Sequence, residues 1–163
     1  MLRLLICVVA VCVLAAGAGF ALAGSRTPIP PDSTLQPIPA RMLGPDVPVP
    51  ISPALLRVRN AWLVSDGRTL VAVYAGSAGN DSSVGRLVIV RQDLAAGRQT
   101  VRTLDTGSTG TLAIAAAPLG GSVETSAQTG TIRLRTAGGR RLVLDLGGGM
   151  GKVSLDPYKA PLP

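Results

Sequence analysis

Residues 54–157 consist of short runs rich in Val, Leu, Ile, Thr and Arg, separated by glycine-containing turns roughly every 8 to 15 residues. This punctuation is typical of an all-β fold. No convincing helix is found, and the best candidate, Gln92 to Gly97, is a single turn. We therefore predict a single antiparallel β-sandwich or small barrel of about seven to nine short strands. The expected strands cover residues 54–65, 68–76, 85–92, 98–105, 111–118, 122–128, 131–137 and 140–147.

The first predicted hairpin turns at Asp66-Gly67. This dipeptide suits a two-residue type I′ turn, because both central residues need a positive φ. Such a turn places Trp62 opposite Val71 and Leu63 opposite Leu70. Both faces of the hairpin are then apolar, so we expect it to lie at the centre of the fold.

The second predicted hairpin spans residues 131–146. A two-residue loop would mix charged and apolar side chains on both faces, whereas a three-residue loop at 137–139 pairs Leu134 with Leu142 and Ile132 with Leu144. The three-residue loop gives one apolar face, which we expect to point into the core. The other face is predicted to contain Arg133, Arg135, Arg141, Val143 and Asp145.

The outward arginines of this hairpin are the candidate binding residues. Arg133, Arg135 and Arg141 should project together on the solvent side of a sheet, either as a binding surface or as charges that keep the sheet wet and deter edge pairing. In the run LLRVRN, Arg57 and Arg59 alternate with apolar residues in the same way. If that strand neighbours the hairpin, all five arginines share one surface.

The N-terminus has the order of a secretory signal peptide. Arg3 is followed by an apolar run to about Ala16 and by the small residues Ala21 and Ala23, which form a possible cleavage site. Residues 4–23 are also long enough for an uncleaved membrane anchor, and the sequence leaves both readings open. In either case the remainder is predicted to be exported, as a secreted or envelope-associated protein.

Composition shifts divide the rest of the chain. Residues 24–53 are dense in proline, which prevents helix and removes ladder donors, so we predict a disordered linker or tail. The predicted organisation is a signal peptide or anchor at 1–23, the proline-rich segment at 24–53, the all-β domain at 54–157 and a C-terminal tail at 158–163.

Several chemistries are excluded by composition. The chain has no histidine, and its two cysteines, Cys7 and Cys12, both lie in the N-terminal segment. Ser-His-Asp catalysis, Cys-His catalysis and ordinary zinc sites are therefore excluded, and we expect no cofactor and no metal. Because aromatic residues make up only 2% of the chain, no nucleic-acid partner is expected.

Two other features leave weaker alternatives. The glycine-rich run from Gly147 to Gly151 lacks the residues that a phosphate-binding loop requires, so we expect a loop or bulge there. A pair of carboxylates could still support catalysis, because glycoside hydrolysis uses two Asp or Glu side chains. The candidates are Asp66, Asp81, Asp93, Asp105, Glu124, Asp145 and Asp156.

The formal net charge of +7 indicates attraction to polyanions. We therefore expect a non-catalytic exported β domain that binds an anionic envelope polymer or membrane surface through its arginine face. One alternative is a structural or protein-interaction module whose arginines are inert, and another is a carboxylate-dependent hydrolase. The sequence identifies neither a small-molecule ligand nor an oligomeric state.

Overall fold

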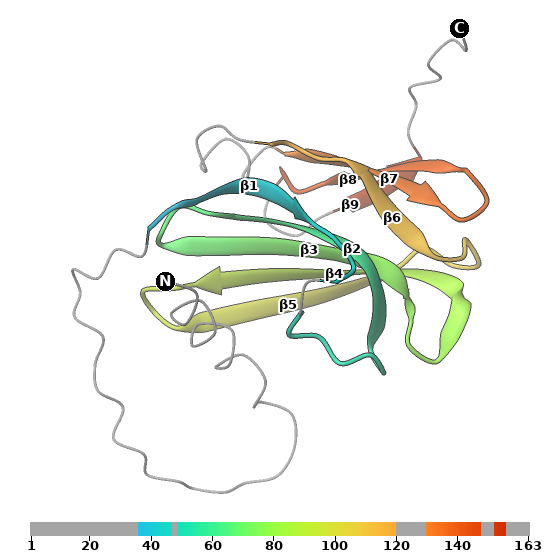
Figure 1. The fold of residues 1–163 in the computed structure, drawn as a ribbon, viewed down its shortest axis with the longest axis horizontal. Helices are drawn as coiled ribbons and strands as arrows, with labels where there is room; N and C mark the ends of the chain where they lie inside the picture. The colour runs from blue at the N-terminus through green and yellow to red at the C-terminus, as the bar shows by residue number, and fades with distance from the viewer. Residues whose placement is uncertain (1–35, 47–48, 120–129, 148–151, 156–163) are drawn as a thin grey trace, which may run out of the picture.

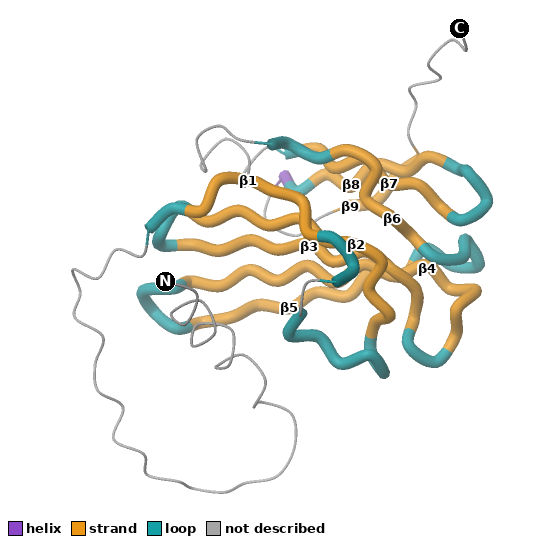
Figure 2. The backbone as a smooth tube through the Cα atoms, in the orientation of Figure 1, coloured by secondary structure: helices purple, strands orange, loops and turns teal. Residues whose placement is uncertain are grey.

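The computed structural model describes residues 36–46, 49–119, 130–147 and 152–155. These residues form two antiparallel β-sheets, and no α-helix occurs among them (Figures 1 and 2). The all-β prediction is confirmed at this level. The strands are β1 (Ile38–Leu43), β2 (Leu56–Ser65), β3 (Thr69–Ala78), β4 (Asp81–Asp93), β5 (Arg98–Asp105), β6 (Leu112–Ala116), β7 (Thr131–Thr136), β8 (Arg141–Asp145) and β9 (Lys152–Leu155).

The strands follow the chain order within each sheet. The first sheet has the order β1-β2-β3-β4-β5 and the second has the order β6-β7-β8-β9. Every neighbouring pair is antiparallel. Figure 1 shows the four-stranded sheet lying over one face of the five-stranded sheet.

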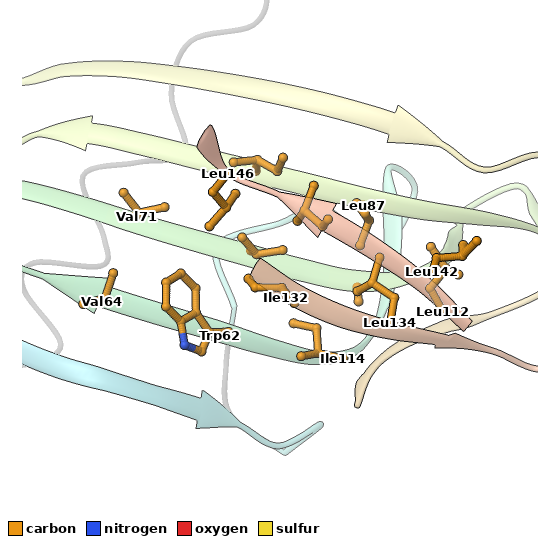
Figure 3. Packing of buried hydrophobic residues seen from close by; sticks show 14 of the residues in the cluster. Trp62, Val64, Val71, Leu87, Leu112, Ile114, Ile132, Leu134, Leu142 and Leu146 are labelled. Carbon is orange, nitrogen blue, oxygen red and sulfur yellow. The ribbon is translucent and has the colours of Figure 1, made fainter. Parts of the chain in front are cut away.

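One apolar core lies between the two sheets and takes side chains from both (Figure 3). Trp62 is completely buried there, and its indole Nε1–H donates to the carbonyl of Pro118 at 2.7 Å. Each large apolar side chain buried in this way contributes about 1.5–3 kcal/mol to folding. The most deeply buried core residues are Trp62, Val64, Val73, Ala75, Leu87, Leu112, Ile132, Leu134 and Leu144.

A second apolar cluster covers the opposite face of the five-stranded sheet. It includes Ala61, Ala72, Tyr74 and Val88, with Ile51 from the segment before β2 packed against it. The β2–β3 hairpin is therefore apolar on both faces, and β3 is the middle strand of its sheet. This confirms the central position expected for the hairpin.

The register predicted for β2 and β3 is wrong by two residues. Trp62 pairs with Val73, whereas a turn centred on Asp66-Gly67 would have paired it with Val71. The central residues of the turn are Gly67 and Arg68 instead, and Gly67 has a φ of 86°. Because the displacement is an even number of residues, every side chain stays on its predicted face.

The displacement has a local cause in the Asp66 carboxylate. Its Oδ1 accepts hydrogen bonds from the backbone N–H of Arg68 at 2.7 Å and of Thr69 at 2.5 Å. Asp66 also donates its own N–H to the carbonyl of Thr69 at 3.2 Å. The side chain thus stabilises a turn that begins one residue later than the dipeptide rule predicts.

The register predicted for β7 and β8 is confirmed. Leu134 pairs with Leu142 and Ile132 with Leu144. The three-residue loop 137–139 closes the hairpin, with Gly139 at a φ of 79° where a side chain would be strained. Thr136 supports the loop, since its N–H donates to the Arg140 carbonyl at 2.9 Å.

The predicted proline-rich linker is wrong for residues 38–43, which form β1 at the edge of the five-stranded sheet. Ala40 is buried in the core between the sheets, and this burial fixes the strand. Pro39 is tolerated because an edge strand has one side without ladder bonds. The sheet structure therefore begins before residue 54. The expected strand at 122–128, the signal peptide or anchor at 1–23 and the tail at 158–163 lie outside the described residues.

Candidate functional site

The candidate arginines of the β7–β8 hairpin lie on the outer face of the four-stranded sheet. Arg133 and Arg135 are exposed and alternate along β7 with the buried Ile132 and Leu134. Arg141 is likewise exposed on β8. The placement predicted for these arginines is confirmed: burial of the apolar positions directs the guanidinium groups outward.

On this face, two arginines of the neighbouring strands β7 and β8 lie directly opposite each other. Arg135 lies directly opposite Arg141, whereas Arg133 lies opposite the half-buried Val143. Side chains in directly opposite positions have Cβ atoms about 4.5–5.5 Å apart, and like charges there are destabilising. An anion that binds both guanidinium groups would relieve this repulsion.

Strand β9 extends the basic face with a residue that sequence reasoning missed. Lys152 is exposed and pairs with Asp145, while Ser154 pairs with Val143. The run after the glycine-rich segment was not recognised as a strand, although Lys-Val-Ser-Leu alternates polar and apolar residues. We call Arg133, Arg135, Arg141 and Lys152 together the basic face.

Within the strands of this sheet, a single carboxylate opposes these charges. Asp145 is the one acidic residue within the ranges of β6 to β9. Its Oδ1 also accepts the backbone N–H of Gly147 at 2.8 Å, so it stabilises the chain that leaves β8. The basic face therefore retains an excess of positive charge.

The other two candidate arginines do not join this surface. Arg57 and Arg59 lie on β2, which belongs to the five-stranded sheet, so the five arginines do not share one sheet. The prediction of a combined arginine surface required β2 to neighbour the hairpin, and it does not. The pairing of β2 with β3 also has a bulge at Arg59, between Val58 and Asn60, which interrupts the alternation of faces.

The carboxylates considered for hydrolysis are used in local contacts wherever the structure describes them. Asp81 accepts hydrogen bonds from Ser83 N–H at 2.9 Å and Ser83 Oγ at 2.7 Å, and these bonds lower its pKa. Asp105 accepts two hydrogen bonds from the Arg86 guanidinium, at 2.6 and 2.9 Å, which lower the pKa of this carboxyl as well.

A glycosidase acid requires the opposite change, a raised pKa. Asp93 accepts the N–H of Ala96 at 2.8 Å and lies 3.7 Å from the Arg98 guanidinium. Glu124 and Asp156 lie outside the described residues. Within the described ranges, no three His, Cys, Asp or Glu side chains form a group that could hold a metal ion.

Comparisons of the chain with protein-family models, with curated proteins and with solved structures gave no match. In the part of the chain that the structure describes, no helix has the length and apolar character to span a membrane.

Proposed function

We propose that this protein is an exported, non-catalytic β-sandwich domain that binds an anionic polymer of the cell envelope through the basic face. The N-terminal signal or anchor sequence supports export, and the formal net charge of +7 supports attraction to polyanions. The function requires no cofactor and no metal.

The observation that supports this proposal most directly is the position of Arg135 opposite Arg141. A sheet whose exposed charges served only for solubility would gain from alternating signs across strands, because like pairs in this position are unfavourable. Guanidinium groups also bind carboxylate and phosphate oxygens through two parallel hydrogen bonds. The pair is thus suited to anion recognition.

A polymer fits the described face better than insertion into a membrane. The outward residues of β7 and β8 include one partly buried valine, Val143, and no aromatic residue. Interfacial insertion relies on apolar and aromatic side chains at the lipid boundary. A row of cationic side chains on a sheet face instead favours contacts with successive charges of an extended polyanion.

The test is binding to an immobilised anionic wall polymer, measured as a function of salt for two matched double variants. Arg135→Ser with Arg141→Ser should weaken binding about two- to thirtyfold, because exposed ion pairs contribute about 0.2–1 kcal/mol each. Arg57→Ser with Arg59→Ser removes the same charge from the other sheet and should have a smaller effect.

Equal losses in the two variants would show that only net charge matters and would overturn the assignment to the basic face. Binding that does not change with salt would support inert arginines, since exposed ionic contacts are screened. Vesicles with anionic headgroups, tested alongside the polymer, identify a membrane ligand if they bind more tightly. Sequencing of the mature N-terminus from the native host tests export.

A further inference from the structure

The two sheets have four edge strands, and three of them are poor templates for another strand. An open edge presents unpaired N–H and C=O groups, which natural proteins protect by short strands, prolines or irregular pairing. β1 contains Pro39 and a register shift. β9 has only four residues. On β6, the side chain of Asn60 occupies both the N–H and the carbonyl of Ile114, at 2.9 Å each.

Strand β5 has none of these protections. It is eight residues long, contains no proline and pairs with β4 in unbroken register, from Asp105 opposite Arg86 to Arg98 opposite Asp93. Most of its residues are exposed. Within the described chain no strand pairs with its other edge, which faces away from β4 (Figure 1).

A row of apolar side chains crosses the outer face of the five-stranded sheet and ends at β5. Successive strands place Leu63 opposite Ala72, Ala72 opposite Val90, and Val90 opposite Val101. Exposure along the row rises from 1% at Ala72 to 8% at Val90 and 52% at Val101. Among the described residues, the row therefore ends at Val101, whose side chain has no apolar neighbour on the side of the open edge.

We propose that β5 pairs antiparallel with β5 of a second copy of this chain, with Val101 opposite Val101 across a two-fold axis. When the two-fold axis is perpendicular to the sheet, the outer faces of the two copies lie on the same side of the joined sheet. A residue can therefore pair only with a residue of the same face in the other copy. Val101 then completes the apolar row across the two copies, and the two five-stranded sheets join into one.

The charges of β5 favour this register over its neighbours. With the axis at Val101, Thr100 lies opposite Arg102 of the other copy and no like charges are directly opposed. Moving the axis to Thr100 places Arg98 opposite Arg102, and moving it to Arg102 places that arginine opposite itself. Both displacements are disfavoured, because directly opposite like charges destabilise a sheet. The strand is therefore more complementary to itself in one register than in the adjacent ones.

Sedimentation of the full chain over a range of concentrations tests the proposal, with two matched variants of β5. The wild type should shift from monomer to dimer as concentration rises. Val101→Lys should remain monomeric, because it places two ammonium groups opposite each other. Thr103→Lys adds the same charge on the same face but lies opposite Gln99 of the other copy, so it should still dimerise.

Cross-linking tests the register in a background that contains Cys7→Ser and Cys12→Ser. Directly opposite residues have Cα atoms about 4.5–5.5 Å apart, within disulfide range, so Val101→Cys should form a covalent dimer on oxidation. The two copies of Thr103→Cys would lie at least about 14 Å apart, because they are four residues apart along the strands at about 3.4 Å per residue, and they should not cross-link.

Three outcomes would overturn the proposal. The first is a monomer at all concentrations with no cross-linking of Val101→Cys. The second is a dimer that Val101→Lys leaves intact, which would place the interface elsewhere. The third is equal cross-linking of both cysteine variants, which would indicate random collision. Because β5 lies in the sheet that does not bear the basic face, none of these outcomes depends on anion binding.

Discussion

The side chain of Asn60 connects the two sheets by two hydrogen bonds to one residue of β6. Its Nδ2 donates to the Ile114 carbonyl at 2.9 Å, and its Oδ1 accepts the Ile114 N–H at 2.9 Å. The amide thus replaces a missing neighbouring strand at the edge of the four-stranded sheet. Both bonds are partly buried, so water is an incomplete substitute.

Replacing Asn60 by alanine leaves both backbone groups of Ile114 without their partner. An unsatisfied buried polar group costs about 1–3 kcal/mol. Because the site is partly buried, we expect about 1–1.5 kcal/mol for each of the two groups, near the bottom of this range, and a total loss of about 2–3 kcal/mol. For a domain of this size, that corresponds to a decrease in Tm of about 10–20 °C. Asn60→Asp should be no better, since its carboxylate can accept the N–H of Ile114 but repels the carbonyl.

Chemical denaturation of the wild type and both variants measures the loss, and amide hydrogen exchange locates it. Exchange at Ile114 should accelerate more than exchange at Leu134 on the neighbouring strand, because β7 keeps its pairing with β8. A loss below about 0.5 kcal/mol for Asn60→Ala, the range of ordinary surface substitutions, would refute the role assigned to this side chain. Equal acceleration at both amides would also argue against a local connection.

Two further predictions concern the five-stranded sheet. Gly76→Ala should lower the free energy of unfolding by about 1–3 kcal/mol, because the new Cβ would meet the backbone carbonyl of Arg57. The control Gly44→Ala places its Cβ in open space and should change the free energy of unfolding by less than about 0.5 kcal/mol. Equal losses in the two variants, measured by chemical denaturation, would contradict the close approach at Gly76. The pKa of Asp105 is lowered by Arg86, so the stability from this pair is present above the unfolded-state pKa of about 3.9 and is lost as the pH falls through the lower folded-state pKa. Because the Asp105 side chain is 46% exposed, the wild type should exceed Asp105→Asn in free energy of unfolding by less than about 1 kcal/mol at pH 7. This difference should vanish in acid, and a difference that does not change with pH would refute the prediction.

The sequence was sufficient to predict the β7–β8 hairpin in detail. Of the two-residue and three-residue loops, only the three-residue loop places Ile132 and Leu134 on the same face as their apolar partners, so hydrophobic burial selects between these two registers. The same argument placed the arginines on the outer face. In the β2–β3 hairpin both faces are apolar, and the pattern could not distinguish registers that differ by two residues. There the Asp66 carboxylate decided the turn.

Elements fixed by distant contacts were missed. β1 lies in a proline-rich segment, and its strand conformation depends on pairing with β2 and on burial of Ala40. β9 is short, and Lys152 joins the basic face only because β9 pairs with β8. Neither segment has a local pattern strong enough to specify a strand, since the stabilising partners are remote in sequence.

By itself, the sequence determined the all-β class, the excluded chemistries and the direction in which the hairpin arginines point. These follow from composition and from a period of two residues, which are local properties. Only the tertiary structure decided which strands are neighbours. It placed Arg57 and Arg59 on one sheet, the basic face on the other, and β5 at an open edge. Strand neighbours depend on closing long loops around a shared core, and a local pattern contains no information about that choice.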